Sequence, residues 1–232
     1  MLTAKVRMCY STNMKITRWI LAAFMGLAVV FTGVQPASAA PLRTVVIGDS
    51  LTYQICGQDH QSIPTREYPQ YIDAGCYGWS GATSGGLWRQ TIEPGWRDPG
   101  IGWPSTQRFN IAAAVSDADL VIIGAGTNNA LRQEDPRFVG WDMNNFRSLM
   151  KPSAKLMWVD VGMRAERVSR SVFDSAGKQN VSIYAAASKL PNTCVIAWGG
   201  QTGVHPEYIQ ADGIHLTPAG YDGRWRTIAK GC

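Results

Sequence analysis

The chain contains five short, mostly apolar runs that are separated by longer segments of mixed polarity. The runs that we expect to form strands cover residues 43–47, 71–74, 120–123, 155–161 and 194–198. Short runs of this kind, rich in β-branched residues and bounded by glycine, proline or serine, are typical of buried strands.

Other segments have the composition or the spacing of helices. The helical segments that we expect are residues 110–115, 136–150, 176–190 and 218–230. Residues 52–70 are polar and residues 81–104 are rich in glycine, proline and tryptophan, so we expect loops there. Strands that alternate with helices predict an α/β fold with a parallel sheet covered on both faces.

The first 39 residues have the pattern of a secretory signal peptide. Lys15 and Arg18 precede an apolar run over residues 19–31, and small residues with the sequence Ala37-Ser38-Ala39 follow. An uncleaved membrane anchor is the alternative, but the run is shorter than the ~20 residues that span a bilayer. We therefore expect export, and a single mature domain over residues 40–232, without stable membrane insertion.

Loss of this leader changes the charge of the chain. The formal net charge of +5 includes four leader cations and no leader acid, so the mature part carries about +1. The basic character therefore gives no reason to expect nucleic acid or an anionic surface as a partner.

The mature part retains four cysteines, Cys56, Cys76, Cys194 and Cys232. An even count in an exported protein indicates two disulfides, for which three pairings are possible. We favour Cys56–Cys76 with Cys194–Cys232. Metal-bound or reactive thiols are the alternative, but no C-x-x-C spacing occurs.

Polar motifs follow the expected strands, and parallel sheets place their sites at the carboxyl ends of strands. The motifs cover residues 48–51 (GDSL), 78–81 (GWSG), 124–129 (GAGTNN) and 212–216 (DGIHL). Each motif alone could be an ordinary polar turn.

Together the motifs supply the parts of nucleophilic catalysis. A serine needs a base to take its proton, a histidine suits that task near neutral pH, and a carboxylate orients the imidazole. Attack on an ester creates an oxyanion that needs preorganised donors, which glycine N–H groups and an asparagine amide can provide.

These motifs and their order resemble the SGNH hydrolases, also called GDSL esterases and lipases. The resemblance implies a three-layer α/β/α sandwich with a five-stranded parallel sheet. It implies Ser50 as nucleophile, His215 as general base and Asp212 as its orienting acid. It also implies an oxyanion hole formed by the N–H groups of Ser50 and Gly81 and the side-chain amide of Asn128.

One position departs from the family pattern, and the resemblance also gives a reason for the favoured disulfide pairing. The family often has aspartate after the catalytic asparagine, whereas this chain has Asn129, which bears on local packing and on the pH profile. A Cys56–Cys76 bridge would tie the nucleophile segment to an oxyanion segment, which is useful because oxyanion donors act by being fixed in advance.

We therefore expect a secreted or cell-envelope serine esterase whose substrate is a carboxylic ester, of either a lipid or an acylated carbohydrate. An acyltransferase with the same triad and a non-catalytic carbohydrate-binding protein are the alternatives. We expect no cofactor and no metal, since the spacing of Cys56, Asp59 and His60 fits no common zinc pattern.

The segment after Gly81 offers candidate substrate contacts. Trp88, Trp96 and Trp103 could pack on sugar rings or acyl chains, or form a small core under a loop. Arg89 and Arg97 could meet an acidic substrate or be solvated surface charges.

Overall fold

Five parallel strands form one sheet in the computed structural model, which describes residues 40–56, 63–93 and 110–232. The strands are β1 (Leu42–Gly48), β2 (Tyr71–Gly78), β3 (Leu120–Gly124), β4 (Lys155–Val159) and β5 (Thr193–Ile196). Their order across the sheet is β2-β1-β3-β4-β5. The chain therefore adds β2 on one side of β1 and adds β3, β4 and β5 on the other side. Such a switch point opens a crevice at the carboxyl ends of the strands.

The central strands β1, β3 and β4 each contain a continuous buried apolar run because both faces of the sheet are covered there. In β1, Val45 and Ile47 contact one core cluster, while Val46 between them contacts the other. In β4, Leu156 and Trp158 likewise alternate with residues of the opposite cluster. Alternation of side chains across a strand thus produces the continuous apolar runs seen in the sequence.

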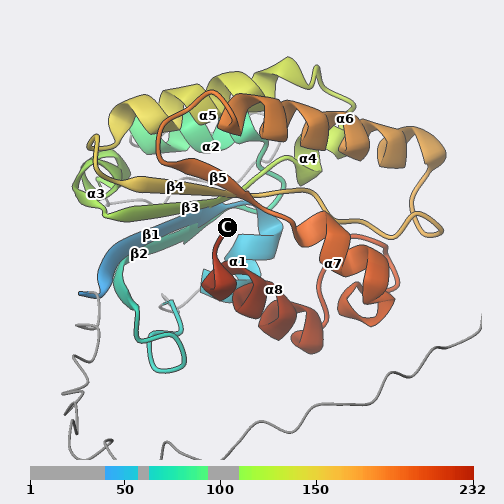
Figure 1. The fold of residues 1–232 in the computed structure, drawn as a ribbon. Coiled ribbons are helices and arrows are strands. Elements are labelled where there is room, and N and C mark those ends of the chain that lie inside the picture. The colour runs from blue at the N-terminus through green and yellow to red at the C-terminus, as the bar shows by residue number, and fades with distance from the viewer. Residues whose placement is uncertain (1–39, 57–62, 94–109) are drawn as a thin grey trace, which may run out of the picture. The chain divides into compact units, whose positions relative to one another are not determined.

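Helices cover the sheet on both faces (Figure 1). On one face pack α2 (Ser84–Ile92), α3 (Ile111–Asp117), α4 (Thr127–Leu131), α5 (Arg137–Leu149) and α6 (Arg170–Ala187). On the other face lie α1 (Ser50–Cys56), α7 (Trp198–Val204), the short 3-10 helix η1 (Pro206–Tyr208) and α8 (Pro218–Lys230). The expected three-layer α/β/α fold with five parallel strands is confirmed.

Several boundaries differ from the sequence-based expectation. The last two expected strands end early, at Val159 and Ile196, and Trp198 begins α7 instead of ending β5. Asn110 is not helical, because its side chain accepts a hydrogen bond from the Ala113 N–H and caps α3. Helix α6 begins at Arg170, after the capping residue Ser169.

Two expected loops contain helices. Residues 50–56 form α1 directly after the first strand, and residues 84–92 form α2 within the glycine-rich segment. Thr83 explains the start of α2, since its hydroxyl accepts a hydrogen bond from the Gly86 N–H. Tertiary packing of Leu87 into the core supports the helix despite its weak sequence pattern.

The structure joins Cys194 of β5 to Cys232 after α8, with Cα atoms 6.1 Å apart. Cys76 is also disulfide-bonded. The side chain of Cys56 lies outside the described residues, so the Cys56–Cys76 pairing stays a prediction. The expected leader, residues 1–39, lies outside them too. No helix in the described ranges is long and apolar enough to cross a membrane.

Candidate active site

Ser50 stands at a sharp turn between β1 and α1. The strand ends at Gly48 and the helix begins only two residues later. A side chain at Gly48 would come within 2.8 Å of the Gly124 carbonyl oxygen and closer still to Thr52, so only glycine allows this approach. Asp49 closes the turn by accepting a hydrogen bond from the Leu51 N–H at 3.0 Å. The turn therefore leaves the Ser50 hydroxyl at the carboxyl end of β1.

Asp212 and His215 lie in one compact loop between η1 and α8. An antiparallel bridge between Ile209 and Leu216 closes the loop, and the Gln210 N–H donates to the His215 carbonyl oxygen at 2.7 Å. This loop does not directly follow β5, as the sequence analysis had placed it, because α7 and η1 intervene. The loop nevertheless brings the side chain of His215 within hydrogen-bond distance of Ser50.

The three side chains form a continuous hydrogen-bonded chain. His215 Nε2 lies 3.2 Å from Ser50 Oγ, and His215 Nδ1 lies 2.6 Å from Asp212 Oδ2. The other oxygen of Asp212 accepts hydrogen bonds from the N–H groups of Ile214 at 2.9 Å and of His215 at 3.0 Å. The carboxylate is therefore held at both oxygens, which fixes the plane of the imidazole.

The environment keeps Asp212 ionised. Partial burial alone raises the pKa of this carboxyl, but hydrogen bonds from the Ile214 N–H and from His215 outweigh that effect. The net pKa of Asp212 lies below its usual value. A charged carboxylate thus faces the histidine over the neutral pH range.

Residues that could hold an oxyanion come from the ends of β2 and β3, the two neighbours of β1. Gly81 adopts a φ of +77°, and no acceptor for its N–H is found among the described residues. Asn128 on α4 is 8% exposed, and its Nδ2 donates to the Ala82 carbonyl oxygen at 3.0 Å. An amide has two N–H groups, so the second remains able to bind a ligand. The N–H of Ser50, at the first position of α1, has no acceptor within its helix.

Two buried ionisable side chains, Asp49 in the turn before Ser50 and Arg224 on α8, were missed by the sequence analysis. Asp49 is 1% exposed and Arg224 on α8 is 3% exposed. Burial raises the pKa of Asp49 to about 6, although the nearby Arg224 guanidinium opposes this shift. A side chain at Gly124 would meet Arg224 Nη2 at 2.3 Å, so this guanidinium packs against the end of β3. No sequence signal marks Arg224, because cations on a closing helix are usually solvated.

Only some of the remaining candidate contacts lie within the described residues. Trp88 packs edge-on against Phe146, with ring centroids 5.3 Å apart, and so contributes to the core. Arg89 is exposed on α2. Trp96, Trp103, Arg97, Asp59 and His60 lie outside the described residues. Within the described ranges, no group of three or more His, Cys, Asp or Glu side chains could hold a metal ion.

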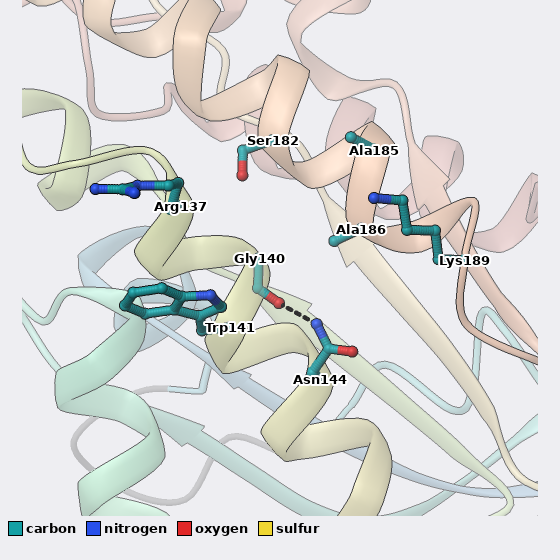
Figure 2. Close-up of a pocket in the computed structure, with 8 residues that line it drawn as sticks. All are labelled: Arg137, Gly140, Trp141, Asn144, Ser182, Ala185, Ala186 and Lys189. Atoms are coloured by element: carbon teal, nitrogen blue, oxygen red, sulfur yellow. Dashed lines mark hydrogen bonds between the residues drawn. The ribbon is translucent and has the colours of Figure 1, made fainter.

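A separate pocket of about 310 Å³ lies between α5 and α6 (Figure 2). Trp141, which is 56% exposed, forms one wall, with Arg137 and Lys189 also lining the pocket. Both helices lie on the face of the sheet that carries α2 and α4 (Figure 1). The pocket contains none of the residues that the motifs single out, so we do not assign it to the candidate active site.

The sheet order defines an α/β protein, and the hydrogen bonds among Ser50, His215 and Asp212 have the arrangement that serine hydrolases use. Comparison with known families makes this more specific. Residues 46–222 match the model of the GDSL-like lipase/acylhydrolase family, and the chain belongs to that family.

Individual relatives are more distant. Over 100 residues the chain is 32% identical to the O-acetyltransferase OatA of Staphylococcus aureus, a match that covers 43% of this chain and 14% of that protein. The chain therefore corresponds to a small part of the length of this curated relative.

Solved structures share the fold at low sequence identity. The lipase Lip_vut3 from a goat rumen metagenome aligns with a TM-score of 0.59 and 14% identity, covering 82% of this chain and 96% of that one. The C-terminal catalytic domain of the peptidoglycan O-acetyltransferase OatA from Streptococcus pneumoniae aligns with a TM-score of 0.53 and 15% identity, covering 82% and 92%.

Proposed function

We propose that this chain is a secreted serine esterase that hydrolyses carboxylic esters through an acyl-enzyme on Ser50. The observation that carries the proposal is the hydrogen-bonded chain from Ser50 through His215 to Asp212, with distances of 3.2 and 2.6 Å. Membership of the GDSL-like lipase/acylhydrolase family supports the ester as substrate. The signal-like leader and the Cys194–Cys232 disulfide support export.

In the proposed first step, Ser50 Oγ attacks the ester carbonyl carbon while its proton passes to His215 Nε2. Asp212 holds the Nδ1 proton of the ring and so keeps Nε2 free to act as the base. The carboxylate also stabilises the imidazolium that forms. The protonated His215 then donates to the leaving alcohol, and the acyl group stays on Ser50.

The negative oxygen of the tetrahedral intermediate needs donors that are in place before the charge develops. We assign this role to the N–H groups of Ser50 and Gly81 and to the side-chain amide of Asn128. In the second half of the cycle, water replaces the alcohol. His215 takes a proton from that water as the water attacks the acyl carbon, then returns the proton to Ser50 Oγ as the acyl–Oγ bond breaks and the carboxylic acid is released.

A panel of p-nitrophenyl esters from acetyl to long-chain acyl groups, together with acetylated sugars, tests the proposal. Ser50→Ala should remove nearly all turnover and leave the thermal unfolding midpoint close to that of the wild type. If S50A cleaved p-nitrophenyl acetate at the native rate, the assignment of the nucleophile would be wrong. The chain-length profile of the wild-type protein separates lipid esters from acetyl esters.

Acyl transfer is the second candidate, because the relatives include two O-acetyltransferases named OatA. In that reaction a sugar hydroxyl, and not water, accepts the acyl group from Ser50. Adding an alcohol acceptor to the acetyl-ester assay discriminates the two. A transferase gives an acetylated acceptor at the expense of acetate, whereas a hydrolase gives acetate regardless of the acceptor.

A further inference from the structure

Three buried polar side chains connect the segments that carry Gly81 and Asn128. Ser84 begins α2, Asn129 lies on α4, and Asp142 lies on α5. The Ser84 N–H donates to Asn129 Oδ1 at 2.9 Å, and the Ser84 hydroxyl donates to Asp142 Oδ2 at 2.6 Å. Asn129 Nδ2 in turn donates to Ser84 Oγ at 3.1 Å. We call these three residues the Ser84 bridge.

The bridge is placed to fix the two oxyanion segments relative to each other. Ser84 is three residues after Gly81, and Asn129 directly follows Asn128. A second link joins the same segments, since Asn128 Nδ2 donates to the Ala82 carbonyl oxygen at 3.0 Å. Movement of the bridge would therefore shift the Gly81 N–H and the Asn128 amide at the same time.

The chemistry of Asn129 matches its place in the bridge. Its Oδ1 accepts from Ser84, while its Nδ2 donates both to Ser84 and to Glu134 Oε2, the latter at 2.9 Å. Only an amide supplies an acceptor and two donors at one end of a short side chain. An aspartate at this position would place a third carboxylate near Glu134 and Asp142 and would lose both donors.

Burial makes the bridge rigid and sensitive to change. Ser84 and Asn129 are fully buried and Asp142 is 8% exposed. Burial also raises the pKa of Asp142, although the hydrogen bond from Ser84 opposes the shift. Buried polar groups are costly unless each is paired, so the removal of one member disturbs the others.

We propose that Ser84, Asn129 and Asp142 are positioning residues that hold the oxyanion donors Gly81 and Asn128 in their reactive geometry. This inference rests on the proposed function. Misplacement of a reacting group by about 1 Å can cost roughly 100-fold in rate. For a partial displacement we expect S84A to lower kcat about tenfold with KM nearly unchanged, because Ser84 is fully buried and has no surface to offer a substrate.

A double-mutant cycle with Asn128 tests the inference. The assay measures kcat and KM on p-nitrophenyl acetate for the wild type, S84A, N128A and S84A/N128A. If the bridge acts through the Asn128 donor, S84A should lower kcat by about threefold or less when it is introduced into N128A, because that donor is already absent. A full additional tenfold loss in the N128A background would show that Ser84 acts elsewhere and would overturn the inference.

Four further variants make the result specific. T91V removes another buried hydroxyl from α2, one that donates to the Leu87 carbonyl oxygen within the helix, and should leave kcat within about twofold of the wild type. D142N keeps an oxygen that can accept from Ser84, so it should retain more of kcat than D142A does. Should S84A fail to fold, N129D replaces it in the cycle with the same expected pattern.

The inference and the proposed function fail in different ways. If S50A is inactive while S84A and N129D keep the wild-type kcat, the positioning role is wrong and the esterase proposal stands. If S50A keeps the wild-type activity, both are wrong. If S84A raises KM and leaves kcat unchanged, the bridge shapes substrate binding and the positioning role is again wrong.

Discussion

Replacement of Asp49 by asparagine should change how stability depends on pH. Burial raises the pKa of Asp49 from 3.8 to about 6 in the folded protein, against the opposing effect of Arg224. The folded state therefore binds more protons than the unfolded state between these two values. As the pH rises through that window, the wild-type protein loses free energy of unfolding, because a buried carboxyl must ionise.

The size of the effect follows from the shift. One pKa unit corresponds to about 1.4 kcal/mol, so the full loss is about 3 kcal/mol, of which roughly 2 kcal/mol falls between pH 4 and pH 7. D49N has no carboxyl to ionise at this position, so its free energy of unfolding does not fall for this reason. We expect the free energy of unfolding of D49N, relative to that of the wild type, to rise by this amount over the same interval. D49N also loses the contacts that Asp49 makes. This loss changes the difference in free energy of unfolding between D49N and the wild type by the same amount at every pH, so it does not affect how that difference depends on pH.

Urea denaturation at several pH values measures the difference. D222N, at an exposed position on α8, is the matched control for loss of one aspartate charge. The reasoning is refuted if the D49N and wild-type curves run parallel from pH 4 to pH 7. It is equally refuted if D49N loses stability relative to the wild type as the pH rises.

Further predictions concern catalysis, packing and the disulfide. Asn128→Ala should lower kcat about 100- to 1000-fold in the p-nitrophenyl acetate assay, the usual effect of removing one oxyanion donor. Gly78→Ala should cost about 3 kcal/mol in urea denaturation, because the new Cβ would lie 2.3 Å from the Tyr53 backbone nitrogen. Gly200→Ala, where nothing lies within 4 Å, should cost nothing. Replacing Cys194 and Cys232 together by serine should cost about 4 kcal/mol, since the bridge closes a loop with a sequence separation of 38. Equal unfolding free energies with and without this bridge would contradict that expectation.

The fold could be predicted because its central strands β1, β3 and β4 are buried on both faces. Such strands appear as short continuous apolar runs, and all five runs form strands of the sheet. The positions of Ser50, Gly81 and Asn128 could be found for a related reason. Each follows a run closely, and a parallel sheet gathers its strand ends at one edge.

Helix α2 and the Ser84 bridge could not be predicted in the same way. Two glycines in the first turn of α2 lower its helix propensity, and the helix depends on the Thr83 cap and on burial of Leu87. The bridge joins Ser84 to Asp142, which are 58 residues apart. Neither residue carries a local pattern that indicates a partner, so only the packed structure brings them together.

The candidate active site has two halves that different parts of the fold hold in place. The proposed donors Gly81 and Asn128 belong to the strand ends and are linked through the Ser84 bridge, whereas Asp212 and His215 belong to a loop closed by its own hydrogen bonds. That loop also contacts the β4–α6 connection, where the Arg164 N–H donates to the Gly213 carbonyl oxygen at 3.0 Å. The Ser50–His215 hydrogen bond joins the two halves. Substitutions in the loop should therefore impair proton transfer and leave the oxyanion donors in place. Substitutions in the bridge should displace the oxyanion donors and leave proton transfer between Ser50 and His215 intact.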